Sequence, residues 1–175
     1  ENYISCLEKK GMEEKNNSGV KKKYGRQRLK DFNYIGTGCY FLTICTDNKK
    51  SIFISPEIVN DVKEILFQNA EKYRFDIICF CFMPDHLHIL TQGTHDESDL
   101  GKFISAFKQK TGFDYKKKNG IILWQKSYYD RIVRKYEDID NICRYIIKNP
   151  VRRGIVKDYK GYNFSWCKYF SVQSD

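Results

Sequence analysis

The segment 75–90 constrains the fold more than any other part of this sequence. An apolar run, Phe75–Phe82, leads into Met83-Pro84-Asp85, and the chain then continues as His86-Leu87-His88-Ile89-Leu90. Proline fixes φ and lacks a backbone donor, so it favours a turn between two strands. The segment therefore predicts an antiparallel β-hairpin.

The second half of this hairpin holds two of the three histidines of the chain. Successive side chains of a strand point to opposite faces, so His86 and His88 share one face while Leu87 and Ile89 share the other. One strand can therefore present two imidazoles to one metal ion. The alternative is an ordinary polar strand face with two partly solvated histidines. The third histidine, His95, is expected in an exposed loop without a role.

The segments around the hairpin alternate between strand and helix patterns. Residues 39–46 and 128–133 are rich in β-branched and aromatic side chains and predict two more strands, the first of them central. Helical spacing predicts three helices: at 56–73, from a cap at Ser98 onward, and at 137–149, where Pro150 should end the helix. This order predicts an α+β fold, an antiparallel sheet with helices packed on it in a ferredoxin- or RRM-like sandwich.

Length and composition predict one domain preceded by a leader. The 175 residues are 41% hydrophobic and 15% aromatic, which is enough for one core. Residues 1–25 are basic with few apolar side chains, so we expect a flexible leader before a single domain at 26–175. No segment resembles a membrane span or the apolar core of a signal peptide, which predicts a cytoplasmic protein without a membrane partner.

The seven cysteines form no C-x-x-C pair, which argues against a zinc knuckle. Most of them stand within apolar strands and helices. We therefore interpret them as buried thiols in a reducing compartment, although Cys79 and Cys81 could share one strand face.

The charge balance favours a polyanionic partner. The sequence has 31 Lys and Arg against 22 Asp and Glu, a net charge of +9, and a pI near 9.1. Nucleic acid is the usual partner of such a surface. The candidate DNA-contacting residues are Arg26, Arg28, Lys108, Lys110, Trp124, Arg131, Arg134 and Arg152. For the lysines the alternative is a solvated helix face, and for Trp124 it is core packing.

The predicted helix at 137–149 carries a second group of candidate residues. Its buried stripe consists of Ile139, Ile142, Cys143 and Ile146. Tyr145 and Asn149 lie one turn apart at the edge of this stripe, where a side chain is half buried and can face a cleft. The phenol and an amide oxygen could then face the metal that the histidines hold. Simple amphipathic packing is the alternative for an edge tyrosine.

Four stretches of the sequence, in this order, resemble the HUH single-tyrosine transposases, in particular the branch of REP-associated tyrosine transposases. They are residues 28–46, Met83-Pro84-Asp85-His86-Leu87-His88, Leu123-Trp124-Gln125-Lys126-Ser127-Tyr128-Tyr129-Asp130, and Tyr145-Ile146-Ile147-Lys148-Asn149-Pro150-Val151. The resemblance covers about residues 26–165. It implies a metal-dependent endonuclease and strand transferase that cuts and joins single-stranded DNA at hairpin-forming, palindromic ends through a covalent 5′-phosphotyrosine.

The resemblance also implies roles for individual residues. The paired metal ligands fall on His86 and His88, the nucleophile on Tyr145, and the third ligand, an amide one helical turn after the nucleophile, on Asn149. Where many relatives have a histidine, this chain has Arg131. Its guanidinium can contact phosphate, but it stays protonated and cannot serve as a base.

Two imidazoles with an amide oxygen suit Mg²⁺ or Mn²⁺. The expected partner is single-stranded or hairpin DNA. The chain could act as a monomer or as a homodimer, with the tyrosine serving its own metal site or that of a second copy. The competing hypothesis is a non-catalytic module that binds single-stranded nucleic acid on an RRM-like scaffold.

Overall fold

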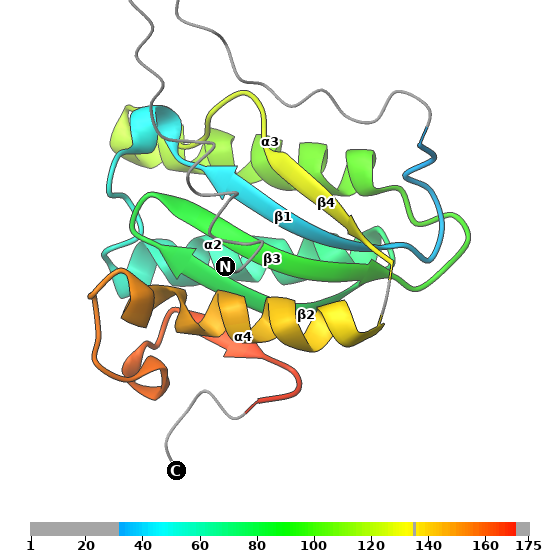
Figure 1. Ribbon diagram of the computed structural model, residues 1–175. Helices are drawn as coiled ribbons and strands as arrows, with labels where there is room; N and C mark the ends of the chain where they lie inside the picture. Colours follow the sequence, from blue (N-terminus) through cyan, green and yellow to red (C-terminus); the bar gives the residue numbers. More distant parts are fainter. Residues whose placement is uncertain (1–31, 135, 171–175) are drawn as a thin grey trace, which may run out of the picture.

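The fold is a five-stranded antiparallel sheet with helices on both faces (Figure 1). A computed structural model describes residues 32–134 and 136–170. The strands are β1 (Cys39–Cys45), β2 (Phe75–Met83), β3 (His86–Gly93), β4 (Tyr129–Val133) and β5 (Ser165–Cys167), in the spatial order β4-β1-β3-β2-β5. All neighbouring pairs are antiparallel. The predicted α+β sandwich is therefore confirmed, and β1 lies inside the sheet beside the central strand β3.

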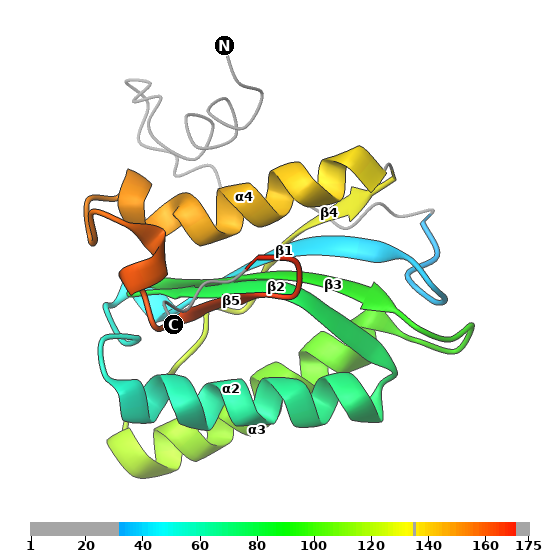
Figure 2. The same cartoon turned by 90° about the horizontal axis from the view of Figure 1, so that it is seen from below.

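Two helices cover one face of the sheet and a third covers the other. Helices α2 (Pro56–Lys72) and α3 (Leu100–Asn119) lie together below the sheet in Figure 2, and α4 (Tyr136–Arg152) lies above it. Two short 3-10 helices, η1 (Asp47–Lys49) and η2 (Tyr159–Gly161), occupy connections. Within residues 32–134 and 136–170, no helix combines the length and apolar character that crossing a bilayer requires.

The period of two along the strands divides the side chains between two layers. On β3, Leu87 and Ile89 enter the core under α2 and α3. His86 and His88 point the other way, toward α4, where His88 contacts Asn149. The same alternation on β1 and β2 fills the space on each side of the sheet. The histidine face of the hairpin is therefore covered by the helix that carries Tyr145.

Helix α3 begins one residue later than the sequence predicted. Its N-cap is Asp99, whose side chain accepts a hydrogen bond from the backbone of Lys102 at 3.0 Å. Ser98, the predicted cap, instead donates its hydroxyl to the carbonyl of Arg74 at 2.7 Å. Serine and aspartate are both good caps, and the tertiary contact with Arg74 decided between the two neighbours.

Helix α4 continues through Pro150, so the prediction that it ends there is wrong. Within a helix, proline loses the bond from its own missing N–H and strains the turn before it. Pro150 lies in the last turn of α4, where few further bonds depend on it. The backbone N–H of Arg153 still donates to the carbonyl of Asn149 at 3.0 Å, and that of Ile155 to Pro150 at 2.9 Å. Asn149 is therefore held inside the helix.

The C-terminal part of the chain forms a strand that the sequence did not predict. This strand, β5, lies at the edge of the sheet and pairs with β2 through Cys79 opposite Cys167. Residues 1–25, the predicted leader, and the candidate DNA contacts Arg26 and Arg28 lie outside the described residues.

Candidate active site

The centre of the site is the pair of histidines on β3. The turn at Pro84 and Asp85 places His86 opposite Met83 of β2, and the strand then directs both imidazoles toward α4. The Nε2 atoms of His86 and His88 are 3.1 Å apart, and both residues are buried. The structure therefore does not support the alternative of two partly solvated histidines on a polar strand face.

A hydrogen bond on the far nitrogen orients each imidazole. Asp85 Oδ1 is 2.6 Å from Nδ1 of His86, and Thr43 Oγ1 is 2.9 Å from Nδ1 of His88. Thr43 stands opposite His88 in the ladder between β1 and β3. An Nδ1–H that donates to such a partner leaves the Nε2 lone pair free, which is the usual arrangement of a metal-binding histidine. Both Nε2 atoms can therefore serve as ligands.

Burial and neighbouring charges set the charge state around the pair. Burial is the main reason that the pKa of His88 lies well below its usual value, and His86 and Arg153 lower it further. His88 is thus neutral at neutral pH, the form that binds a metal. The hydrogen bond from His86 is the main reason that the pKa of Asp85 is lowered, so Asp85 is a carboxylate.

Asn149 supplies a third donor from α4. Its Nδ2 is 3.0 Å from Nε2 of His88, and the residue is buried. Half a turn of the amide about its terminal bond puts Oδ1 in that place. A hard cation with ligand distances of about 2.1 Å and octahedral angles separates adjacent ligands by about 3.0 Å. The contacts of Asn149 and His86 with His88 match this spacing, so the residues present fit a divalent ion.

Tyr145 lies one turn before Asn149 and faces the same histidines. Its ring centroid is 5.7 Å from that of His88 and 6.0 Å from that of Phe41, both in edge-on geometry. The guanidinium of Arg152 lies 4.9 Å from the centre of the tyrosine ring. Tyr145 is half-buried, so its phenol is not enclosed by the core. A single chain thus brings its own tyrosine and its own histidines to one place.

The family that matches this chain is described as "Transposase IS200 like", and its sequence profile matches residues 37–149, well over half of the chain. The chain belongs to the IS200-like transposases. The matched range begins just before β1 and ends at Asn149, so it contains the histidine pair, Asp85, Thr43 and Tyr145.

Relatives of this IS200-like transposase are REP-associated. A candidate REP-associated tyrosine transposase of Haemophilus influenzae is 25% identical, with 73% of this chain and 78% of that protein covered. The REP-associated tyrosine transposase of Escherichia coli K12 is 23% identical, with 75% and 78% covered. A solved REP-associated tyrosine transposase bound to a REP hairpin superposes with a TM-score of 0.66 at 21% identity, with 77% and 79% covered. That structure shares the fold.

The resemblance found in the motifs is therefore confirmed. The chain is a tyrosine transposase of the type that nicks and joins DNA, and the family generally uses a divalent metal.

Two of the predicted DNA-contacting residues lie on the α4 side of this IS200-like transposase. Arg152 is beside Tyr145, and Arg131, on β4, approaches Asp138 of α4 at 3.4 Å. Their position on the tyrosine side of the sheet is compatible with DNA contact. Arg134 is exposed directly after β4, and all three arginines remain predictions for DNA contact.

The other predicted DNA contacts within the described residues lie on the opposite side. Lys108 of α3 donates to two backbone carbonyls of the loop at 125–126, at 2.7 and 3.0 Å. Lys110 pairs with Asp114 at 2.9 Å along the same helix. Trp124 is buried, with its ring in the core under α2 and α3. This placement supports core packing for Trp124 over a role in base stacking.

Sequence reasoning missed three residues of the site. Asp85 precedes His86 directly, so a carboxylate next to a candidate ligand was an available signal. Thr43 is 45 residues from His88 and is found only through strand register. Arg153 lowers the pKa of His88, and it follows the predicted end of the helix, so no pattern pointed to it.

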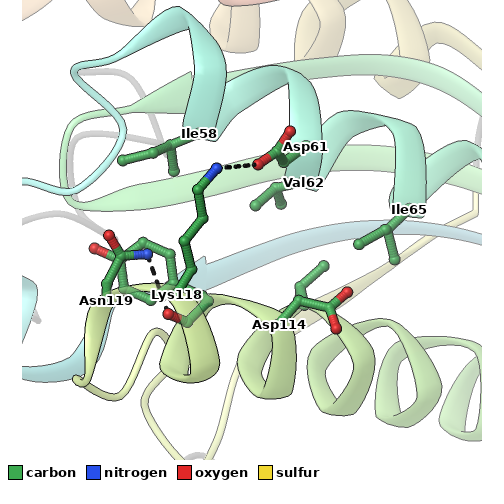
Figure 3. Close-up of a pocket in the computed structure, with 9 residues that line it drawn as sticks. Ile58, Asp61, Val62, Ile65, Asp114, Lys118 and Asn119 are labelled. Atoms are coloured by element: carbon green, nitrogen blue, oxygen red, sulfur yellow. Dashed lines mark hydrogen bonds and ion pairs between the residues drawn. The ribbon is translucent and has the colours of Figure 1, made fainter.

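A separate hollow lies between α2 and α3 (Figure 3). It is lined by apolar side chains of α2, including Ile58, Val62 and Ile65, and by polar ones of both helices. Lys118 of α3 reaches across to Asp61 of α2 at 3.4 Å. The two helices cover the face of the sheet opposite to α4 (Figure 2), so the hollow takes no part in the histidine site.

Proposed function

We propose that this protein is a metal-dependent single-stranded DNA endonuclease and strand transferase that acts through a covalent 5′-phosphotyrosine at hairpin-forming DNA. The observation that carries the proposal is the convergence of Tyr145 with His86, His88 and Asn149 within one chain. A nucleophile beside a set of metal ligands is the arrangement that phosphodiester cleavage by covalent catalysis requires.

Three side chains would hold the ion, which we propose to be Mg²⁺ or Mn²⁺. They are His86 and His88 through Nε2 and Asn149 through its amide oxygen. Asp85 and Thr43 would orient the two imidazoles through hydrogen bonds to their Nδ1 atoms. A bound divalent ion would neutralise charge on a non-bridging phosphate oxygen and hold the phosphorus for in-line attack. Imidazole ligands favour Mn²⁺ over Mg²⁺, because Mg²⁺ prefers oxygen.

Tyr145 would supply the nucleophile. Its phenol loses a proton, its Oη forms a bond to phosphorus, and the bond from phosphorus to the 3′ oxygen breaks. The departing 3′ oxygen takes up a proton and leaves as a hydroxyl, while the 5′ phosphate stays on the tyrosine. A phenol normally titrates near pH 10, and a cation close to it favours the phenolate. Arg152, over the ring of Tyr145, is placed for that role.

The reverse of this step joins DNA. The phosphotyrosine keeps the energy of the broken phosphodiester, so a 3′-hydroxyl can attack it and release the tyrosine without a nucleotide cofactor. The same residues would serve both directions, since the transition state of the reverse step is that of the forward step.

The proposed substrate is DNA with a hairpin beside a single-stranded cleavage site. Three observations support it: the net charge of +9, the arginines on the tyrosine side of the sheet, and the REP hairpin bound by the solved relative. Charge supplies the affinity for phosphates.

We further propose that each chain completes its own site. Tyr145 lies beside His88 of the same chain, so no second copy is needed to bring nucleophile and ligands together. A mixture of His86→Ala and Tyr145→Phe proteins tests this. If sites formed between two copies, the mixture would regain adduct formation, whereas in the proposed arrangement it stays inactive.

The competing hypothesis of a non-catalytic binding module has less support. An RRM-like module stacks bases on an open sheet face. Here α4 covers one face and α2 with α3 cover the other (Figure 2). The family match points to the transposase instead.

The decisive experiment is capture of the covalent adduct. The wild-type chain is incubated with Mn²⁺ and an oligonucleotide that contains a hairpin and its flank. The oligonucleotide is labelled at its 3′ end, on the fragment that would stay on the tyrosine, and protein-linked label is resolved on a denaturing gel. Tyr145→Phe should form no adduct and still bind the hairpin. The matched control, Tyr159→Phe, alters another half-buried tyrosine that packs against the α4 layer and should form adduct normally. Adduct with Tyr145→Phe would disprove the assignment.

A further inference from the structure

Three cysteines that the proposed reaction does not use lie close together between the sheet and α4, the helix that carries Tyr145. Cys79 comes from β2, Cys143 from α4 and Cys167 from β5, and their Sγ atoms all lie within 4.8 Å of one another. All three residues are buried, with exposed fractions of 0%, 0% and 3%. Each comes from a different element, so the thiols converge through the tertiary structure and not through a local motif.

The spacing of the three sulfur atoms is that of a metal site. In a tetrahedral thiolate site the zinc–sulfur distance is about 2.3 Å, so adjacent sulfur atoms are about 3.8 Å apart. The observed limit of 4.8 Å lies within a small side-chain rotation of this value. A disulfide would use only two of the three thiols and would leave the third unexplained.

The cluster favours one thiolate. Hydrogen bonds from the thiols of Cys143 and Cys79 lower the pKa of Cys167 far below that of a free cysteine. Burial raises the pKa of Cys79, and the hydrogen bond with Cys167 is the main reason that the pKa of Cys143 is raised, so these two residues are thiols that metal binding would deprotonate. The thiol of Cys79 also approaches the carbonyl oxygen of Cys143, at 4.0 Å. The donor set is therefore soft, compact and shielded from water.

We propose that Cys79, Cys143 and Cys167 form a structural zinc site that fastens the tyrosine helix and β5 to the sheet. Binding converts two thiols, one thiolate and one Zn²⁺ into a three-thiolate complex and releases two protons to the solvent. Zinc suits the site better than Cu⁺. Three thiolates with Zn²⁺ leave a charge of −1 in the apolar layer, whereas Cu⁺ leaves −2, which costs more to bury.

The site lies close to the active site without being part of it. Cys143 is two residues before Tyr145 and points to the sheet, while Tyr145 faces the histidines. Fixing Cys143 to β2 fixes the rotation of α4, and with it the positions of Tyr145 and Asn149. β5 is a short edge strand. Among the strands within residues 32–134 and 136–170 it pairs only with β2, so the ion can reach the site from this edge of the sheet.

The test measures metal content and cobalt spectra in a chain whose histidine site is removed. His86→Ala/His88→Ala protein, expressed in zinc-supplemented medium and purified without chelator, should retain one zinc per chain by mass spectrometry. Adding Cys143→Ser or Cys167→Ser should abolish it. Adding Cys81→Ser should not, because Cys81 is buried on the same face of β2 but outside the cluster. Co²⁺ in place of zinc should give thiolate-to-metal charge-transfer absorption in the histidine-free protein.

Three outcomes would overturn the proposal. The first is a histidine-free protein with neither zinc nor the cobalt charge-transfer band, a result that needs no cysteine variant to fold. The second is zinc that persists in folded Cys143→Ser protein. The third is retention of Cu⁺ with exclusion of Zn²⁺, which would assign the cluster to another ion. None of these outcomes bears on the adduct assay, so this proposal and the proposed function fail separately.

Discussion

Replacing Thr43 by valine tests the site through a residue that touches neither metal nor DNA in the proposed mechanism. The threonine hydroxyl is 2.9 Å from Nδ1 of His88 and stands opposite it in the β1–β3 ladder. Valine keeps the β-branched shape that suits a strand and removes only the hydrogen-bonding group. The fold should therefore survive, while His88 loses the partner that orients its ring and fixes its proton on Nδ1.

The size of the effect follows from two independent magnitudes. Leaving a buried N–H without a partner costs about 1–3 kcal/mol. Removing an outer partner of a metal-binding histidine weakens metal affinity by about 10- to 100-fold, which corresponds to about 1.4–2.7 kcal/mol. We therefore expect Thr43→Val to need about 10- to 100-fold more Mn²⁺ for half-maximal adduct formation.

The assay is adduct yield as a function of Mn²⁺ concentration, measured in parallel for wild type, Thr43→Val and Thr43→Ser. The serine variant keeps a hydroxyl at the same position, so its midpoint should stay near that of wild type. At saturating Mn²⁺ the valine variant should approach the wild-type rate, because Tyr145 and Arg152 are unchanged. A valine midpoint within a factor of about two of wild type would refute the proposed role of the Thr43 contact, since the expected shift is at least tenfold.

Three further predictions concern the metal, a glycine and a half-buried lysine. EDTA should abolish adduct formation, and added Mn²⁺ should restore it in wild type but not in His86→Ala, as a gel assay would show. Gly93→Ala should destabilise the fold by about 1–3 kcal/mol in urea melts, because its Cβ would collide with the backbone carbonyl of Gly36, whereas Gly161→Ala, in open space, should not. Burial lowers the pKa of Lys108 from 10.5 to about 8. Between these two pH values Lys108 is protonated in the unfolded chain and neutral in the folded chain. The free energy of unfolding of wild type relative to Lys108→Met, measured in urea melts, should therefore rise with pH over that window.

Much of the fold and site could be read from the sequence, because the signals are local. The alternation around His86 and His88 depends only on the geometry of a strand, and the Pro84 turn depends on neighbouring residues. Tyr145 and Asn149 share a helix edge because the helical period puts residues four apart on one side. The order of the strands and helices was enough to predict the α+β sandwich, and four short motifs in order carried the resemblance to the transposases.

Several features depended on how distant elements pack. The pairing of Thr43 with His88 follows from strand register, and the burial of Trp124 follows from the position of α3. Ser98 does not cap α3, because its hydroxyl donates to the carbonyl of Arg74 instead. Helix α4 runs through Pro150 because the proline lies in its last turn, where few further backbone hydrogen bonds depend on it.

The sequence by itself determined which side chains share a face: two imidazoles on one strand, and a phenol with an amide on one helix. Only the tertiary structure decided that these two faces meet within a single chain, and that three cysteines from β2, α4 and β5 converge behind them. The physical reason is the distance along the chain over which each kind of interaction acts. Backbone periodicity is set within a few residues, whereas the contact between segments some 60 residues apart is set by the register of the whole sheet and by the packing of α4 against it.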